Sequence, residues 1–249
     1  MRIVGIVLVL ILATGANAWI FDNRPSLKIP TNTVIEYDVP AQFVSMNEKQ
    51  RKVEFIKWIL PIVVRQNNLV MQERKIIVKL QNRELLGIQL RETEIDFLNI
   101  MQLKYGGNSF DDLLSRVNVI PTALVISQAS IESGWGSSRF AQEGNNLFGI
   151  RTYDKNTPGM KPKNNVNANF KVRSYLTVDD SVANYQLLLN THHAYKDFRT
   201  ARSYMSHVDA MDDHALADTL FDYSELGSQY IEMIHVHLNN IEKLLNDLQ

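Results

Sequence analysis

The 249-residue chain contains no cysteine. This excludes disulfide bridges, a thiol nucleophile, zinc–thiolate sites and iron–sulfur clusters, so the core alone must stabilise the fold. An excess of charge of either sign is also lacking, because 26 Lys and Arg are matched by 27 Asp and Glu. A formal net charge of −1 gives no general attraction to nucleic acid or to an anionic membrane. We expect neither a nucleic-acid partner nor a cofactor, and no metal site.

The sequence also lacks a hydrophobic run that is long enough to cross a membrane. The apolar stretch near the N-terminus, residues 4–13, is about ten residues long, whereas a membrane-spanning helix needs roughly 20. It follows Arg2 and precedes the small-x-small site Ala16-Asn17-Ala18, which is the anatomy of a secretory signal peptide. We expect residues 1–18 to be a signal peptide that is cleaved after Ala18, with an uncleaved anchor as the alternative.

The hydrophobic pattern of the first half predicts helices after a short arm. Residues 19–44 are rich in Pro, Asn and Asp, which predicts a linker or extended arm. Apolar residues then recur at three- and four-residue spacings, and this predicts a helical region over residues 45–117. Pro61 is expected to kink its first helix or to divide it into two.

The second half, residues 118–249, combines helical segments with one irregular polar stretch. Thr177 and Asp180 form a predicted capping box at the start of one of these helices. Between residues 151 and 174 the chain is polar, and its apolar residues indicate a short β-hairpin. The sequence therefore predicts a mainly α fold. Helices are predicted over residues 121–133, 177–190, 195–207, 213–220 and 228–248.

Glu132 is the residue best suited to chemistry. It lies in the last turn of an otherwise apolar predicted helix that Gly134 ends. Burial and the negative end of the helix dipole both disfavour a carboxylate, so its proton should be held more tightly than in water. A carboxylic acid that stays protonated near neutral pH can act as the general acid in glycoside hydrolysis.

The residues after Glu132 are consistent with a sugar-binding cleft. Gly134 and Gly136 allow a sharp turn and a close approach to a ligand, and Trp135 offers a flat face for stacking on a sugar ring. The alternative interpretation makes Glu132 a solvated residue at a helix end and Trp135 an anchor of the core. The spacing of these residues does not decide between the two.

The run IESGWGSSRFAQEGNNLFGI, residues 131–150, resembles the signature of the glucosaminidase domain of glycoside hydrolase family 73. Members of that family cut the glycan strands of bacterial cell walls. The resemblance covers about residues 118–245, and the N-terminal segment around Phe55 and Pro61 resembles the Bax-type members. Further matches follow in the family order: residues 170–175, 181–185, 193–195, 223–224 and Tyr230.

The resemblance implies a lysozyme-like helical domain with a small β-hairpin lobe, preceded by the N-terminal helical region. It makes Glu132 the catalytic acid and gives Tyr223 an accessory catalytic or positioning role. It also implies roles in substrate binding for four residues, with Tyr230 at the cleft edge or in a structural position. These four are Trp135, Asn146, Phe148 and Tyr230.

One departure from the family pattern concerns the second carboxylate, which many relatives carry in the hairpin lobe. Here Asp154 is the only acidic residue between Arg151 and Val172. Asp154 is therefore one candidate for the second carboxylate, and Glu225 is a lesser one. The N-acetyl group of the substrate could instead act as the nucleophile, or the domain could be slow or inactive.

These residues are consistent with three functions. The first is an endo-β-N-acetylglucosaminidase that cleaves the β-1,4 bond on the reducing side of N-acetylglucosamine in peptidoglycan. The second is a lytic transglycosylase on the same fold, and the third is a catalytically inactive module that binds the cell wall. All three imply peptidoglycan glycan strands as the partner and an exported protein, in the periplasm of a Gram-negative bacterium. The oligomeric state is left open.

Overall fold

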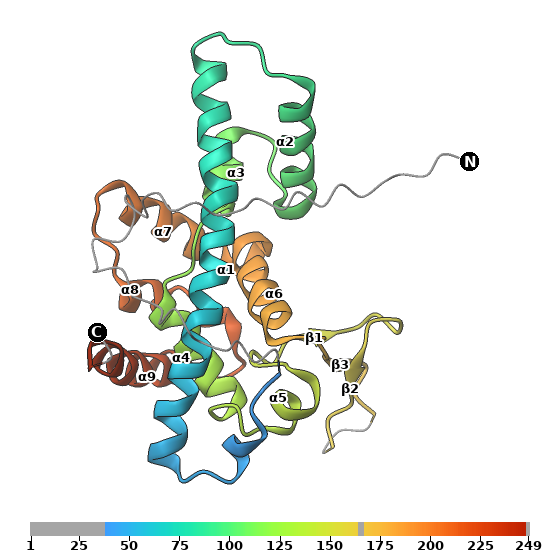
Figure 1. Cartoon of the computed structure of the whole chain (residues 1–249), viewed down its shortest axis with the longest axis vertical. Coiled ribbons are helices and arrows are strands. Elements are labelled where there is room, and N and C mark those ends of the chain that lie inside the picture. The colour runs from blue at the N-terminus through green and yellow to red at the C-terminus, as the bar shows by residue number, and fades with distance from the viewer. Residues whose placement is uncertain (1–37, 164–166, 248–249) are drawn as a thin grey trace.

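The computed structural model describes residues 38–163 and 167–247, so the expected signal peptide lies outside the described residues. Helices dominate the described part, and one small antiparallel sheet accompanies them (Figure 1). This confirms the predicted mainly α, lysozyme-like architecture with a small β lobe. The helices are α1 (Glu48–Leu85), α2 (Glu92–Tyr105), α3 (Phe110–Arg116), α4 (Thr122–Ser133), α5 (Arg139–Gly144), α6 (Val178–Thr191), α7 (Lys196–His207), α8 (Asp213–Asp218) and α9 (Ser228–Asp247).

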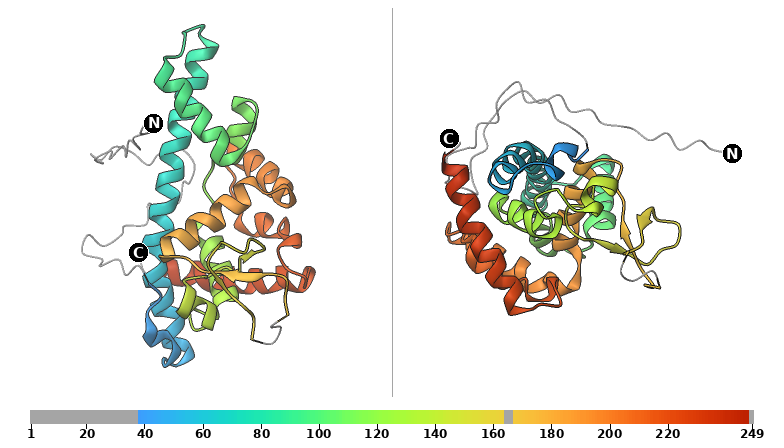
Figure 2. Two further views of the ribbon diagram at one scale, coloured as in Figure 1. Left: turned by 90° about the vertical axis from the view of Figure 1, so that its right-hand side faces the viewer. Right: turned by 90° about the horizontal axis from the view of Figure 1, so that it is seen from below.

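Helix α1 is a single element that runs along the whole height of the molecule (Figures 1 and 2). Asn47 caps it, because the Asn47 side chain accepts a hydrogen bond of 3.0 Å from the backbone N–H of Gln50. The helix continues through the buried Pro61 instead of dividing there. Its first half buries Phe55, Ile59 and other apolar residues in the main core. The prediction of two helices that meet at Pro61 is therefore wrong.

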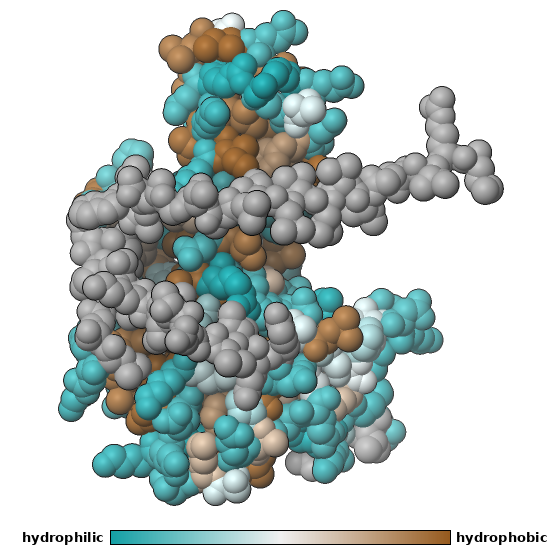
Figure 3. All heavy atoms as spheres, in the orientation of Figure 1, coloured by the Kyte–Doolittle hydropathy of each residue, from teal (hydrophilic) through white to brown (hydrophobic). Residues whose placement is uncertain are grey.

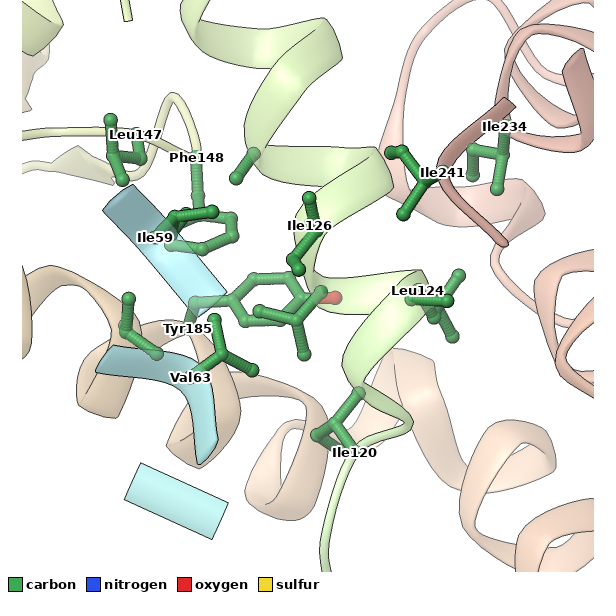
Figure 4. Packing of buried hydrophobic residues seen from close by; sticks show 14 of the residues in the cluster. Ile59, Val63, Ile120, Leu124, Ile126, Leu147, Phe148, Tyr185, Ile234 and Ile241 are labelled. Carbon is green, nitrogen blue, oxygen red and sulfur yellow. The ribbon is translucent and has the colours of Figure 1, made fainter. Parts of the chain in front are cut away.

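Helix α4 lies at the centre of the main core. Almost all of its residues are buried, and it packs against α1 on one side and against α9 on another. Figure 4 shows Ile126 of α4 beside Phe148, with Ile59 of α1 and Tyr185 of α6 completing the cluster. An apolar helix with no solvent-facing stripe is expected at such a position, because every face of it meets another element.

A second, smaller cluster fills the space between the far half of α1 and helices α2 and α3. Its buried members include Ile77 of α1, Tyr105 of α2 and Leu113 of α3. The apolar side chains around the turn between α1 and α2 remain exposed, and they form the brown patch at the top of Figure 3. Helix α1 thus contributes to both clusters and joins the N-terminal helical region to the remainder of the fold.

The irregular stretch between α5 and α6 forms the β lobe. Three short strands pair antiparallel in the order β1-β3-β2, so β3 is central and β1 and β2 are both edges. The predicted two-stranded hairpin is therefore a three-stranded sheet. Its strands are β1 (Arg151–Thr152), β2 (Gly159–Met160) and β3 (Lys171–Arg173).

The predicted arm over residues 19–44 ends earlier than expected. Residues 41–44 form a short 3-10 helix, and Val39 and Phe43 are buried in the main core. The backbone N–H of Val39 donates a hydrogen bond of 3.2 Å to the side-chain oxygen of Asn145. The described end of the arm is therefore a packed element, which corrects the expectation of a linker for residues 39–44.

A buried arginine connects α7 to the segment that leads into α4. Arg202 is fully buried, and its guanidinium donates to the backbone oxygens of Ser115 and Val119 at 2.9 and 3.1 Å. It also donates at 2.7 Å to the side-chain oxygen of Asn190 on α6. Burying a charge is costly unless it is hydrogen-bonded, and these partners give each terminal nitrogen of the guanidinium an acceptor, whereas its Nε has no partner among the described residues. Arg202 therefore fixes the junction of three elements.

Candidate active site

Glu132 occupies the end of α4, as the sequence predicts. The helix stops at Gly134, whose φ of 57° is left-handed, and Trp135 continues the left-handed turn with φ 57°. Glu132 itself is half-buried, and burial raises the pKa of its carboxyl above the ordinary value. The direction of this shift agrees with the sequence-based expectation for a general acid.

A tyrosine from α9 contacts the carboxyl group of Glu132. Tyr230 is buried and hydrogen-bonds Glu132, which lowers the pKa of Glu132 in opposition to the larger effect of burial. Burial and the nearby Glu132 charge raise the pKa of Tyr230 well above its usual range. The Tyr230 hydroxyl therefore stays protonated and acts as a hydrogen-bond donor. Its hydrogen bond to a carboxylate is stronger than its hydrogen bond to a neutral carboxyl group.

The orientation of the Tyr230 hydroxyl is set by a buried amide. The amide nitrogen of Gln128, one turn before Glu132, donates to the Tyr230 hydroxyl oxygen at 2.9 Å. The hydroxyl of Tyr185 donates to the oxygen of the same Gln128 amide. This contact orients the amide so that its nitrogen faces Tyr230. Because Tyr230 accepts from Gln128, its own proton is free to point at Glu132. Neither Gln128 nor Tyr185 is among the site residues predicted from the sequence.

The loop between α5 and β1 lies against the other side of the acid. A Cβ atom added to Gly149 would come within 3.1 Å of a carboxyl oxygen of Glu132, and the φ of Gly149 is +65°. Only glycine allows both the left-handed backbone and this close approach. The side chain of Asn146 holds the loop, since its oxygen accepts from the backbone N–H groups of Phe148 and Ile150 at 3.1 and 3.2 Å.

Tyr223 links this loop to Tyr230. Its hydroxyl donates a hydrogen bond of 3.0 Å to the backbone oxygen of Phe148. Its ring stacks on the ring of Tyr230 with centroids 5.6 Å apart and an interplanar angle of 4°. Burial raises the pKa of Tyr223 well above its usual range, so it remains a neutral donor. Tyr223 is thus placed to position the loop and Tyr230.

Two expected sugar-binding side chains lie in the core. The Trp135 side chain is 9% exposed, meets the edge of Phe55 at a centroid distance of 5.8 Å and stacks on His237 at 5.2 Å. The ring of Phe148 is 2% exposed and stacks on Tyr185 at 4.1 Å. The structure therefore places Trp135 according to the alternative interpretation, as a core anchor. Asn146 is also buried, with its hydrogen bonds inside the protein.

The close approach expected of Gly136 is made to the protein itself. A Cβ atom added there would lie 2.7 Å from the ring of Phe43 and 3.3 Å from the ring of Phe55. Gly136 therefore serves core packing, and Gly134 provides the left-handed turn that ends α4.

The two candidates for a second carboxylate are both exposed. Asp154 accepts hydrogen bonds from the backbone N–H of Asn156 at 3.0 Å and from the hydroxyl of Thr157 at 2.8 Å, and these lower its pKa. It therefore stabilises its own turn. Glu225 has an 89% exposed side chain and pairs with Arg151 at 3.6 Å. Arg151 in turn lowers the pKa of Glu132, so Glu225 is linked to the site through a shared cation.

No group of three or more His, Asp or Glu side chains in the described parts of the chain is arranged to hold a metal ion. Within the same residues, no helix is long and apolar enough to cross a membrane.

Comparison with known proteins gives two matches. Residues 107–242 match the sequence profile of the glucosaminidase family, described as mannosyl-glycoprotein endo-β-N-acetylglucosaminidase. The chain is also 31% identical over 206 residues to the protein bax of Escherichia coli strain K12, an alignment that covers 78% of this chain and 71% of that protein. No solved structure matches. The profile spans more than half of the chain and includes Glu132, Asn146, Tyr223 and Tyr230, so the chain belongs to the glucosaminidase family.

Proposed function

We propose that the protein is an exported peptidoglycan hydrolase, an endo-β-N-acetylglucosaminidase that cleaves the β-1,4 bond on the reducing side of N-acetylglucosamine. Glu132 is its general acid. The observation that carries the proposal is the half-buried carboxyl group of Glu132, whose protonated form is favoured by burial and which receives a hydrogen bond from Tyr230. Membership of the glucosaminidase family supports the class of substrate.

In the proposed reaction Glu132 gives its proton to the glycosidic oxygen as the bond to C1 breaks. The hydroxyl of Tyr230 then donates to a full carboxylate instead of a neutral carboxyl group, and this hydrogen bond is stronger after the proton has left. An interaction that strengthens along the reaction lowers the barrier, whereas one that is equally strong throughout does not. Gln128 and Tyr223 keep Tyr230 in this orientation.

We propose further that the N-acetyl group of the substrate is the nucleophile. Its carbonyl oxygen attacks C1 as the bond to the leaving oxygen breaks and the proton of Glu132 moves to that oxygen. Water then attacks C1 as the bond between C1 and the acetyl oxygen breaks, which restores the N-acetyl group. The water gives a proton to Glu132, so the acid is restored and the two displacements retain the configuration. The exposure of Asp154 and Glu225, and the internal partners that each already has, support this assignment over a second carboxylate.

Asp154→Asn and Glu225→Gln test the nucleophile. Both variants are expected to keep turnover of sacculi within about tenfold of the wild type, because neither side chain takes part in bond formation. Initial rates of sugar release measure the effect. A loss of more than about a hundredfold in one variant would assign the second catalytic group to that carboxylate and exclude the substrate-assisted route.

The products distinguish the two enzymatic alternatives. The proposed hydrolase leaves reducing N-acetylglucosamine ends, whereas a lytic transglycosylase leaves 1,6-anhydro-muramic ends. Mass spectrometry of sacculi digested by the wild-type protein is expected to show only the former. Anhydro products would assign the transglycosylase function instead. If the wild type and the Glu132→Gln variant both bound sacculi and neither solubilised them, the protein would be a wall-binding module without turnover.

A further inference from the structure

Arg151 is a cation beside the acid to which neither the family signature nor the proposed mechanism gives a role. It opens strand β1 two residues after Gly149, the position where an added Cβ atom would come within 3.1 Å of a Glu132 carboxyl oxygen. Its guanidinium lies over the ring of Phe170, 4.4 Å from the ring centroid. Such a contact fixes the orientation of a guanidinium while its N–H edge stays available for a second partner.

The present anionic partner of Arg151 is held loosely. The guanidinium lies 3.6 Å from a carboxylate oxygen of Glu225, beyond the 2.7–2.9 Å of a charge-assisted hydrogen bond. The two side chains are 48% and 89% exposed. A solvent-exposed pair of this kind contributes little to stability. Another carboxylate that approaches from solvent can therefore replace Glu225.

Arg151 also has an unfavourable effect on a general acid. Its positive charge lowers the pKa of Glu132, against the effect of burial that keeps the proton in place. A bound anion on Arg151 would cancel this effect. Arg151 is therefore compatible with acid catalysis by Glu132 when an anionic group of a bound substrate pairs with its guanidinium.

The proposed substrate carries such a charge. A glycan strand of N-acetylglucosamine and N-acetylmuramic acid is neutral along its sugar rings. Its anionic groups are the lactyl carboxylates of muramic acid units without a peptide and, where a peptide is attached, the carboxylates of that peptide. Arginine presents a planar fork of donors that matches a carboxylate. We propose that Arg151, held on Phe170, binds a carboxylate of the muramic acid unit next to the scissile bond. This inference rests on the proposed function and names the group by which the site selects its substrate.

Two matched substrates test the inference. Glycan strands stripped of peptide by an amidase bear free lactyl carboxylates, and coupling those carboxylates to methylamine with a carbodiimide removes the charge without changing the sugars. The wild-type protein is expected to cleave the charged strands with a kcat/KM about five- to tenfold above that for the amidated strands. Arg151→Gln is expected to abolish this preference by lowering kcat/KM on the charged strands alone.

Arg139→Gln provides the control. Arg139 on α5 also lies over a phenylalanine ring, Phe140, and pairs with Glu143 at 3.3 Å, but it is not among the groups that act on Glu132. This variant is expected to keep the preference for charged strands. Equal kcat/KM values of the wild type on both substrates would overturn the inference, and so would an unchanged preference in Arg151→Gln.

Binding measurements separate this inference from the proposed function. Glu132→Gln, which lacks the acid, is expected to bind charged strands about five- to tenfold more tightly than amidated ones, and the double variant with Arg151→Gln is expected to lose the difference. If the wild type cleaved neither substrate, the proposed function would fail, and the binding data would still decide whether Arg151 recognises a carboxylate. Equal binding of both strands would overturn the inference.

Discussion

Glu132→Gln is expected to lower kcat on bacterial sacculi by about 10²- to 10⁴-fold, the usual contribution of a general acid. Glutamine has the shape of glutamic acid and can accept the hydrogen bond from Tyr230, but it has no proton to give to the glycosidic oxygen. Release of reducing ends measures the loss. A residual activity above about a tenth of the wild type would show that Glu132 is not the acid.

Glu143→Gln serves as the control for this experiment. Glu143 lies in the same signature segment, but its side chain is 57% exposed and pairs only with Arg139 of the same helix. Exposed ion pairs of this kind contribute little, so activity and stability should both stay near the wild-type values. A comparable loss in this variant would indicate a general effect of the substitution on the segment.

The pH dependence of stability gives an independent check on Glu132. Burial raises the folded-state pKa of Glu132 above its ordinary value, so the folded protein holds this proton more tightly than the unfolded chain. The resulting stabilisation is fully present below the unfolded pKa and is lost as the pH rises through the folded pKa. Relative to the wild type, Glu132→Gln should therefore gain stability as the pH rises from the unfolded pKa through the folded pKa, which melting temperatures measured from about pH 4 to about pH 8 would show.

Arg202→Met is expected to lower the free energy of unfolding by about 3 kcal/mol. The substitution removes the donor from the part-buried backbone oxygens of Ser115 and Val119 and from the buried side-chain oxygen of Asn190, and each loss of a buried partner costs about 1–3 kcal/mol. Methionine fills much of the space, so the effect reports mainly the lost hydrogen bonds. Equilibrium urea unfolding, followed by circular dichroism, measures it.

Tyr204→Phe provides the matched substitution on the same helix. The side chain of Tyr204 is 69% exposed, so removing its hydroxyl should change the free energy of unfolding by less than about 0.5 kcal/mol. If Arg202→Met lost less than about 1 kcal/mol, the guanidinium would not be the junction of α6, α7 and the segment before α4.

Glu132 could be found from the sequence because its environment is local. The apolar residues of α4, the glycine that ends the helix and the resulting burial all lie within about one turn or two of the carboxyl group. The direction of its pKa shift follows from these features. Gln128 is equally local, but its hydrogen bonds to Tyr230 and Tyr185 join residues 102 and 57 positions away, and no spacing in the sequence indicates them.

The positions of Trp135 and Phe148 could not be inferred in the same way. An aromatic residue beside glycines fits a ligand site and a core equally well, and its partners decide between them. Those of Trp135 are Phe55 on α1 and His237 on α9, at opposite ends of the described chain. The third strand of the β lobe could not be predicted for a similar reason. Strand β2 pairs only with β3, and ten residues separate the two strands in the sequence.

Helix α1 is part of the unit that must fold around the helix that carries Glu132. The family profile begins at residue 107, yet Phe55, Ile59 and Val63 of α1 complete the interior that surrounds α4. A fragment cut at the profile boundary would expose the apolar flank of the helix that carries the acid. The profile marks the segment that the family shares, whereas the part of this chain that can fold must also include helix α1.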